Sequence, residues 1–130
     1  MKNPNIKSFL KGFDRKDEKL VFNLIESTEF EPADRLIRKG SKDRCIIFIG
    51  SGQFMGFKDV ENEIYKEGAI LGINEFITDS PWPHDVICSK SGYICKFTYE
   101  SLLDLTNTAP ITAIKLVRRV IRHQCYSYIY

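Results

Sequence analysis

The sequence lacks a long hydrophobic run. No segment approaches the ~20 consecutive apolar residues that a helix needs to span a bilayer, and the N-terminal stretch MKNPNIKSFLKGF lacks the apolar core of a signal peptide. The sequence also lacks an excess of one charge, because 19 lysines and arginines against 17 aspartates and glutamates leave a formal net charge of +2. We therefore expect no direct membrane insertion and no global attraction to nucleic acid or anionic lipid.

Cysteine is scarce and scattered. The sequence has four cysteines and two histidines, with no CxxC pair, so its spacing favours neither a disulfide framework nor a metal site. Three cysteines stand in apolar, β-branched runs, where a free thiol behaves as a small core hydrophobe: Cys45, Cys88 and Cys95. We expect these three to be buried and reduced, which indicates an intracellular, reducing compartment.

Catalytic signatures are missing as well. No carboxylate pair, nucleophile motif or metal-ligand cluster stands out at a readable spacing. We expect no catalytic and no metal-binding residues, and we interpret the chain as non-catalytic.

The length of 130 residues fits one domain, residues 1–130, with its own hydrophobic core. Residues 1–27 have helical patterns. Asp14 suits an N-cap, Asp17 and Glu18 suit the first turn, and the apolar spacing that follows predicts a helix from Arg15 to Ser27. Four apolar residues on one helical face predict a short helix or turn before it: Ile6, Phe9, Leu10 and Phe13.

Residues 28–98 have strand patterns instead. Short β-branched or aromatic runs alternate with turn residues, and no segment between them is long enough for a helical crossover. This predicts about eight antiparallel strands in a sandwich or barrel. The runs are TEFE, RLIRKG, RCIIFIGSG, QFMGF, NEIYKEG, DVICS and GYICKFT.

Helix patterns return in residues 99–130. The leucines between residues 102 and 105 predict a short helix, and Pro110 suits the first position of a longer one, about Ala109 to Tyr126. An apolar stripe on the longer helix predicts a buried face. Its members are Ile111, Ile114, Val117, Ile121 and Cys125, with Leu116 and Val120 beside them.

The opposite face of this helix is basic. It carries Lys115, Arg118, Arg119, Arg122 and His123. No acidic residue occurs from Ala109 to Tyr130, so the local charge is about +4. We interpret the charges as a solvated face or as a contact for an acidic partner. Nucleic-acid binding is not expected, because no aromatic residue is interleaved with them to stack on bases.

Two motifs connect these elements to a known family. FEPADRLIRKGSKDRCIIFIGSGQF is similar to the family's opening pattern, and GAILGINEFITDSPWPHDV, residues 68–86, is similar to its phosphate-binding cassette. With this order of helices and strands, the chain resembles the cyclic-nucleotide-binding domain of kinase regulatory subunits, ion channels and bacterial catabolite regulators. The matching residues are Pro32, Asp34, Ile37, Gly40, Asp43, Ile49, Gly52 and Phe54, then Gly68, Gly72, Phe76, Ile77, Pro81 and Val86.

The resemblance implies a mainly β fold with flanking helices. The family's core is an antiparallel, jelly-roll-like β-roll of eight strands with N-terminal helices, a hinge helix and a long C-terminal helix. It also implies a ligand pocket at the cassette. The corresponding residues here are Leu71, Gly72, Ile73, Asn74, Glu75, Trp82, Pro83 and His84.

The cassette departs from the family at both polar anchors. Register places Ile73 where relatives have a glutamate for the ribose and Trp82 where they have an arginine for the cyclic phosphate. Because a charge-assisted hydrogen bond to phosphate is worth about 1.5–3 kcal/mol, we expect normal cAMP and cGMP binding to be lost. The backbone N–H groups of the turn LGINEF leave weak cAMP or cGMP binding open.

Three cassette residues have two interpretations each. Glu75 either reaches a ribose or is a solvated helix carboxylate, and His84 meets an anion only when protonated, which an ordinary pKa near 6.5 disfavours at pH 7. Trp82 either fills the emptied pocket or is an exposed anchor for a partner.

We interpret the chain as a regulatory or scaffolding module that acts through other proteins in a larger assembly. The alternative is a cyclic-nucleotide or small-anion sensor with non-standard pocket contacts. A homodimer through the C-terminal helix is a further alternative, and the last residues, Tyr126, Tyr128 and Ile129, either pack over the roll or cap a base. The style of the cassette resembles channel and ciliary members, so we expect a cytoplasmic or ciliary location rather than secretion.

Overall fold

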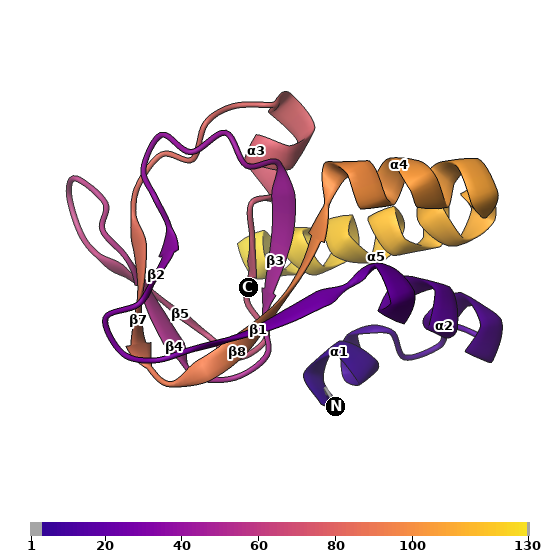
Figure 1. Ribbon diagram of the computed structural model, residues 1–130, viewed down its shortest axis with the longest axis horizontal. Coiled ribbons are helices and arrows are strands. Elements are labelled where there is room, and N and C mark those ends of the chain that lie inside the picture. The colour runs from indigo at the N-terminus through magenta and orange to yellow at the C-terminus, as the bar shows by residue number, and fades with distance from the viewer. Residues whose placement is uncertain (1–3, 130) are drawn as a thin grey trace.

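The computed structural model describes the backbone of residues 4–129 and the side chains of residues 6–123. Within that part, five helices flank eight strands (Figure 1). No helix there combines the length and the apolar character needed to cross a bilayer. In chain order the elements are α1 (Pro4–Phe9), α2 (Arg15–Leu24), β1 (Glu26–Phe30), β2 (Arg35–Ile37), β3 (Cys45–Ile49), β4 (Gln53–Gly56), β5 (Glu63–Lys66), β6 (Ile70–Leu71), α3 (Ile73–Thr78), β7 (Val86–Lys90), β8 (Gly92–Thr98), α4 (Tyr99–Thr108) and α5 (Pro110–Ile129).

The strands form two four-stranded sheets, in the orders β1-β8-β3-β6 and β2-β7-β4-β5. All the pairings are antiparallel. The roll lies on one side of the molecule and the helices α1, α2, α4 and α5 lie together on the other (Figure 1). This arrangement confirms the expected antiparallel β-roll with flanking helices. β6 is missing from the predicted strands, because its two residues give no periodic pattern inside the cassette.

The helix predicted to reach Ser27 ends at Leu24 instead. Its start is as predicted, because the Asp14 side chain accepts a hydrogen bond from the Asp17 backbone N–H at 2.8 Å. The end differs because residues 26–30 pair with β8, which places Ser27 opposite Cys95. Strand pairing therefore takes over two residues that helical spacing alone assigns to α2, and Ile25 before them is the C-cap of the helix.

Strand β3 is buried along its whole length because its two faces belong to two cores. Ile46 and Phe48 pack with the helices. Cys45, Ile47 and Ile49 point the other way, into the interior of the roll. Alternation of side chains across a strand thus joins the helical layer to the roll through one central element.

The orientation of α5 contradicts the predicted buried stripe. Ile111, Ile114, Val117 and Ile121 are 64%, 54%, 38% and 44% exposed. The buried face is formed by Thr112, Ala113, Leu116 and Val120. Cys125, the fifth residue of the predicted stripe, lies outside the residues with described side chains.

A polar contact between α2 and α5 fixes this rotation. Thr112 donates a hydrogen bond to Asp17 at 2.5 Å, and the Lys115 Nζ lies 2.8 Å from the other carboxylate oxygen of Asp17. Both donors hold the pKa of Asp17 below its ordinary value. Asp17 is 95 positions from Thr112 and 98 positions from Lys115 in the sequence, so the periodicity of α5 could not predict this contact.

The predicted basic face is likewise only partly solvated. Besides the Lys115–Asp17 pair, Arg119 donates to the backbone carbonyls of Phe9 and Lys11, at 2.5 and 3.0 Å. Its guanidinium also lies over the ring of Phe13. Two of the four cations therefore hold α5 against the N-terminal helices.

The cysteine prediction is confirmed for the three residues that the structure describes. Cys45, Cys88 and Cys95 are buried, and none of them forms a disulfide with another described cysteine. Burial raises the pKa of the Cys45 thiol to about 11, so it stays protonated. These thiols act as small core hydrophobes.

Candidate functional site

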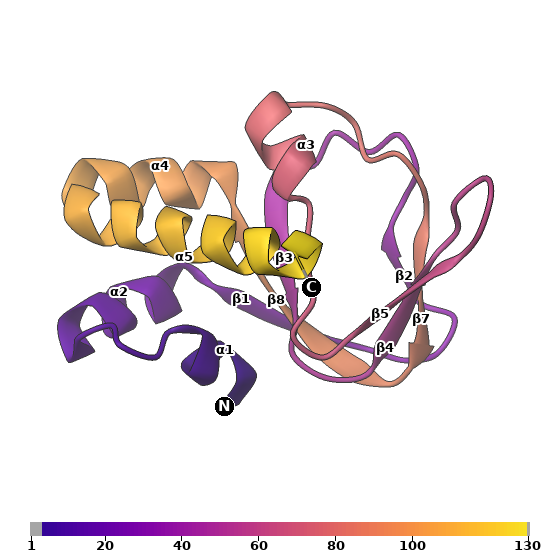
Figure 2. The same cartoon turned by 180° about the vertical axis from the view of Figure 1, so that it is seen from behind.

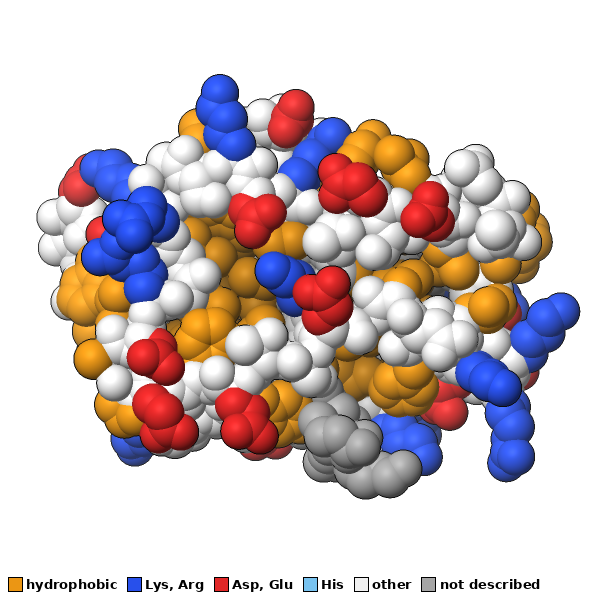
Figure 3. Space-filling model, in the orientation of Figure 1, with side chains coloured by type: hydrophobic (Ala, Val, Ile, Leu, Met, Phe, Trp, Pro, Cys, Tyr) orange, Lys and Arg blue, Asp and Glu red, His pale blue; other side chains and the backbone are white. Residues whose placement is uncertain are grey.

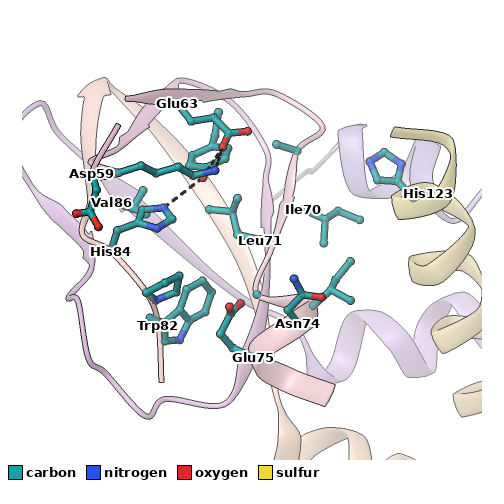
Figure 4. Close-up of a pocket in the computed structure, with 16 residues that line it drawn as sticks. Asp59, Glu63, Ile70, Leu71, Asn74, Glu75, Trp82, His84, Val86 and His123 are labelled. Atoms are coloured by element: carbon teal, nitrogen blue, oxygen red, sulfur yellow. Dashed lines mark hydrogen bonds and ion pairs between the residues drawn. The ribbon is translucent and has the colours of Figure 1, made fainter. Parts of the chain in front are cut away.

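A cavity of about 660 Å³ opens between the roll and the end of α5, and we name it the roll cavity (Figure 4). Its volume lies within the range of small-molecule pockets in proteins. It is lined by Lys58, Asp59, Glu63, Tyr65, Ala69, Ile70, Leu71, Gly72, Ile73, Asn74, Glu75, Trp82, Pro83, His84, Val86 and His123.

All eight pocket residues that the family register implies line this one cavity. Leu71 ends β6, residues 72–75 form the start of α3, and residues 82–84 precede β7. The predicted interaction residues on α5 lie elsewhere: Lys115, Arg118, Arg119 and Arg122 border a separate hollow of about 210 Å³ with Gly12 and Phe13.

Gly72 turns the chain from β6 into α3 at the edge of the cavity. Its φ of +94° lies in the left-handed region, which glycine enters without steric cost. A Cβ at this position would lie 2.5 Å from Cη2 of Trp82 and 2.6 Å from the Cys45 carbonyl oxygen. The turn therefore needs glycine both for its conformation and for the close approach of the indole.

The two positions at which the sequence predicts loss of the family's anchors are both buried. Ile73 is 8% exposed and belongs to the core shared with the helices, where Phe76 packs. Trp82 is 5% exposed and packs in the interior of the roll. The indole is thus unavailable at the surface, so the interpretation of Trp82 as an exposed anchor is wrong.

Trp82 separates two hollows of the roll. It lines the roll cavity on one side and a hollow of about 170 Å³ on the other, where Ile37 and Ile94 also lie. The face of the roll drawn in Figure 3 is hollowed, with hydrophobic side chains in the hollow. The indole Nε1 donates to the backbone carbonyl of Asp43 at 2.8 Å, so the ring is held with its polar atom satisfied.

Acidic groups outnumber basic ones around the cavity. Glu75 points from α3 into the cavity beside Trp82 (Figure 4). At the other end, Lys58 forms an ion pair with Glu63, and Asp59 lies next to it in sequence. With the histidines left out, one lysine against three carboxylates gives the lining a formal charge of −2.

His84 adds little positive charge. Burial, and next the nearby Lys58, hold its pKa below the ordinary value of 6.5. Its Nε2 lies 3.4 Å from the hydroxyl of Tyr65. Burial, together with Glu63, raises the pKa of that phenol to about 12, so Tyr65 remains a neutral hydrogen-bonding group.

Arg44, the arginine nearest the cassette in sequence, is already engaged. Its Nε donates to the carbonyl of Phe76 at 2.8 Å, and its guanidinium lies 3.7 Å from the centre of the Tyr99 ring. It also lies 3.9 Å from the carboxylate of Asp79. Arg44 fastens the end of α3 and does not line the roll cavity.

Sequence analysis missed five polar residues of the cavity. Lys58, Asp59, Glu63 and Tyr65 come from β5 and the loop before it, and His123 comes from α5. The strand run NEIYKEG was predicted, but no pattern in it indicates which pocket its side chains face.

The residues predicted to pack over the roll or cap a base, Tyr126, Tyr128 and Ile129, lie outside the described side chains. Among the described residues, no group of three or more His, Cys, Asp or Glu side chains is placed to hold a metal.

Comparisons with known proteins agree with this geometry. Residues 27–109 match the family model of the cyclic nucleotide-binding domain. No curated protein sequence matches the chain significantly.

Several solved structures have the same fold. A cyclic nucleotide-binding domain from Methylobacillus flagellatus aligns with a TM-score of 0.85 at 14% identity, over 96% of this chain and 77% of that one. The catabolite activator protein of Thermus thermophilus aligns at 0.70 and 12% identity, over 93% and 60%. The regulatory subunit of a cAMP-independent protein kinase A from Trypanosoma brucei aligns at 0.68 and 21% identity, over 94% and 44%.

Proposed function

This chain belongs to the cyclic nucleotide-binding domain family, and from that premise we propose that it is a non-catalytic regulatory or scaffolding module without normal cAMP or cGMP binding. It acts through contacts with other proteins in a larger assembly. The observation that carries this proposal is the electrostatic character of the roll cavity, in which no unengaged lysine or arginine faces the ligand space among the described residues.

A cyclic phosphate in this cavity lacks a cationic partner. Lys58 is neutralised by Glu63, and the lowered pKa of His84 keeps its imidazole neutral at pH 7. Glu75 adds a negative charge inside the cavity. Because an anion leaves water only where paired charges and hydrogen bonds replace its solvation, a cyclic nucleotide is disfavoured at the place that its family uses.

The size of the loss follows from the missing contacts. A charge-assisted hydrogen bond contributes about 1.5–3 kcal/mol, and each 1.4 kcal/mol is tenfold in affinity, so the missing arginine alone weakens binding roughly 10- to 150-fold. The missing ribose acceptor and the acidic lining add to this. The Trypanosoma structure with this fold is the regulatory subunit of a protein kinase A described as cAMP-independent, which supports a regulatory role without cAMP.

The rival function is a sensor for a cyclic nucleotide or small anion through non-standard contacts. One observation favours it: Trp82 leaves the roll cavity open at about 660 Å³ instead of filling it. A homodimer through α5 is a further arrangement, which the exposed residues Ile114, Val117 and Ile121 leave open.

Calorimetry separates the two functions. Titration of the protein with cAMP and with cGMP up to millimolar concentration is expected to give no saturable heat. The double variant Ile73→Glu/Trp82→Arg introduces both anchors at buried positions, so its fold is first checked by circular dichroism. The folded double variant is expected to bind cAMP measurably, while Ile73→Glu alone is not. A dissociation constant below about 10 μM for the unmodified protein would establish the sensor instead.

A further inference from the structure

Helix α5 presents an apolar stripe and two arginines that no other part of the described chain uses. Figure 2 shows α5 at the front of the helical layer, with no other element drawn over it. The stripe, which we name the α5 stripe, consists of Ile111, Ile114, Val117 and Ile121. Its members recur at intervals of three or four, so they lie along one side of the helix.

The arginines Arg118 and Arg122 border the α5 stripe. They are four residues apart, so they are neighbours on the helix surface, and both are exposed. Within the described residues they form no hydrogen bond or ion pair, whereas Lys115 and Arg119 beside them are engaged by Asp17 and by backbone carbonyls. All four cations border the hollow of about 210 Å³ between α5 and the turn after α1.

We propose that the α5 stripe and the pair Arg118–Arg122 form a docking surface for an amphipathic helix of a partner protein whose apolar side is flanked by carboxylates. An apolar row bordered by free cations is complementary to an apolar row bordered by aspartates or glutamates. A helix laid along α5 covers the stripe and places its carboxylates against the two guanidinium groups. This inference rests on the proposed function and names the class of partner.

A second copy of the chain fits this surface less well. The sequence has no acidic residue from 109 to 130, so a pair of α5 helices brings cations together without carboxylates of their own to balance them. An anionic membrane surface also fits less well. Polybasic attachment uses clusters of about four to eight cations, and among the side chains of α5 that the structure describes only two cations are free.

The test uses the full chain and a synthetic helical peptide of about 18 residues, with leucines in one stripe and glutamates along both flanks. A peptide of the same pattern with lysine in place of every glutamate is the control ligand. Fluorescence anisotropy is expected to show saturable binding of the acidic peptide, weakened by salt, and about tenfold or more weaker binding of the basic peptide.

Surface variants locate the contact. Ile114→Asp and the pair Arg118→Glu/Arg122→Glu are each expected to weaken the acidic peptide about tenfold or more, and the charge-reversed protein is expected to prefer the basic peptide. Val60→Asp is the matched control for the apolar change, because Val60 is 98% exposed on the loop before β5. Lys66→Glu/Lys90→Glu is the control for charge reversal, because both lysines are exposed on the sheet β2-β7-β4-β5, away from α5.

Three results would overturn the inference: equal binding of both peptides, a dimer in sedimentation that Ile114→Asp dissolves, or binding to vesicles of anionic phospholipid in place of the peptide. The calorimetric result with cAMP is independent of these. If the protein binds both the acidic peptide and cAMP tightly, the docking surface is supported and the proposed loss of nucleotide binding is wrong. If the protein binds neither, only the docking surface is wrong.

Discussion

The indole Nε1 of Trp82 donates a hydrogen bond to the backbone carbonyl of Asp43 across 2.8 Å. The backbone of Trp82 also pairs with Ser41 and Gly40, each at 2.8 Å, so one residue fastens the β2–β3 loop to the cassette. Trp82, which we predict from the family register to stand at the phosphate-pairing position, therefore serves as a structural support of the roll.

Truncation of this support is expected to destabilise the protein. Trp82→Ala removes a large buried ring between two hollows and is expected to lower the free energy of unfolding by about 3–5 kcal/mol in urea denaturation. Trp82→Phe keeps most of the apolar contact but leaves the Asp43 carbonyl without its donor, so its loss is smaller. Ile77→Ala, at a residue 62% exposed, is the control. An effect of Trp82→Ala no larger than that of the control would contradict this role.

Gly72→Ala is also expected to be destabilising. Alanine at a φ of +94° costs about 1–2 kcal/mol, and its Cβ would in addition meet the Trp82 ring at 2.5 Å. The melting temperature is the measurement, and Gly68→Ala is the matched control. Gly68 also has a positive φ, of +91°, but no heavy atom lies within 4 Å of its added Cβ. Equal losses for the two variants would show that approach of the indole contributes nothing.

The contact between α2 and α5 predicts a particular pH dependence. The pKa of Asp17 is lower in the folded protein than in the unfolded chain, chiefly because Lys115 and Thr112 donate hydrogen bonds to the carboxylate. Its contribution is therefore complete above the ordinary carboxyl pKa of about 3.9 and is lost as the pH falls through the lower folded pKa. Unfolding curves from pH 7 to pH 2 are expected to show a steeper loss of stability below pH 4 in the unmodified protein than in Asp17→Asn.

Thr112→Val separates the hydrogen bond from the charge. It removes one donor to Asp17 at nearly constant volume and is expected to cost about 0.5–1.5 kcal/mol at pH 7. Parallel pH profiles for the unmodified protein and Asp17→Asn would contradict the assigned role of the carboxylate.

His84 is expected to titrate below its ordinary pKa. Burial is the larger cause and the charge of Lys58 adds to it, so folding favours the neutral imidazole. Stability attributable to this group is complete above a pH of about 6.5 and decreases as the pH falls below it. Histidine NMR signals, assigned with His84→Gln, are expected to give a midpoint under 6.5, and Lys58→Met is expected to raise it. A midpoint above 6.5 would place a cation in the roll cavity.

Most of the fold could be predicted from the sequence because its local signals agree with one another. The Asp14 cap, the strand runs and Pro110 at the start of α5 are short-range features, and the structure has each of them where it was predicted. That the cassette residues line one cavity was predictable because the family register extends through Gly72 and Pro81. These parts depend on neighbouring residues or on a known pattern.

The parts that were missed depend on distant contacts. Two apolar rows run along α5, and the choice of the row with Leu116 and Val120 for burial is set by Asp17, far away in sequence. The facing of Glu63 and Lys58 into the roll cavity depends likewise on where the β4–β5 hairpin closes over it. Hydrophobic periodicity predicts that a helix or strand has an apolar face, but not which other element packs against that face.

The most direct test of the central claim is a site-resolved titration with cAMP by ¹H–¹⁵N NMR. The account predicts that the backbone amides of residues 71–75, 82 and 84–86 show no saturable shift at millimolar cAMP. Saturable shifts of the Gly72 and Glu75 amides with a dissociation constant below about 10 μM would contradict it.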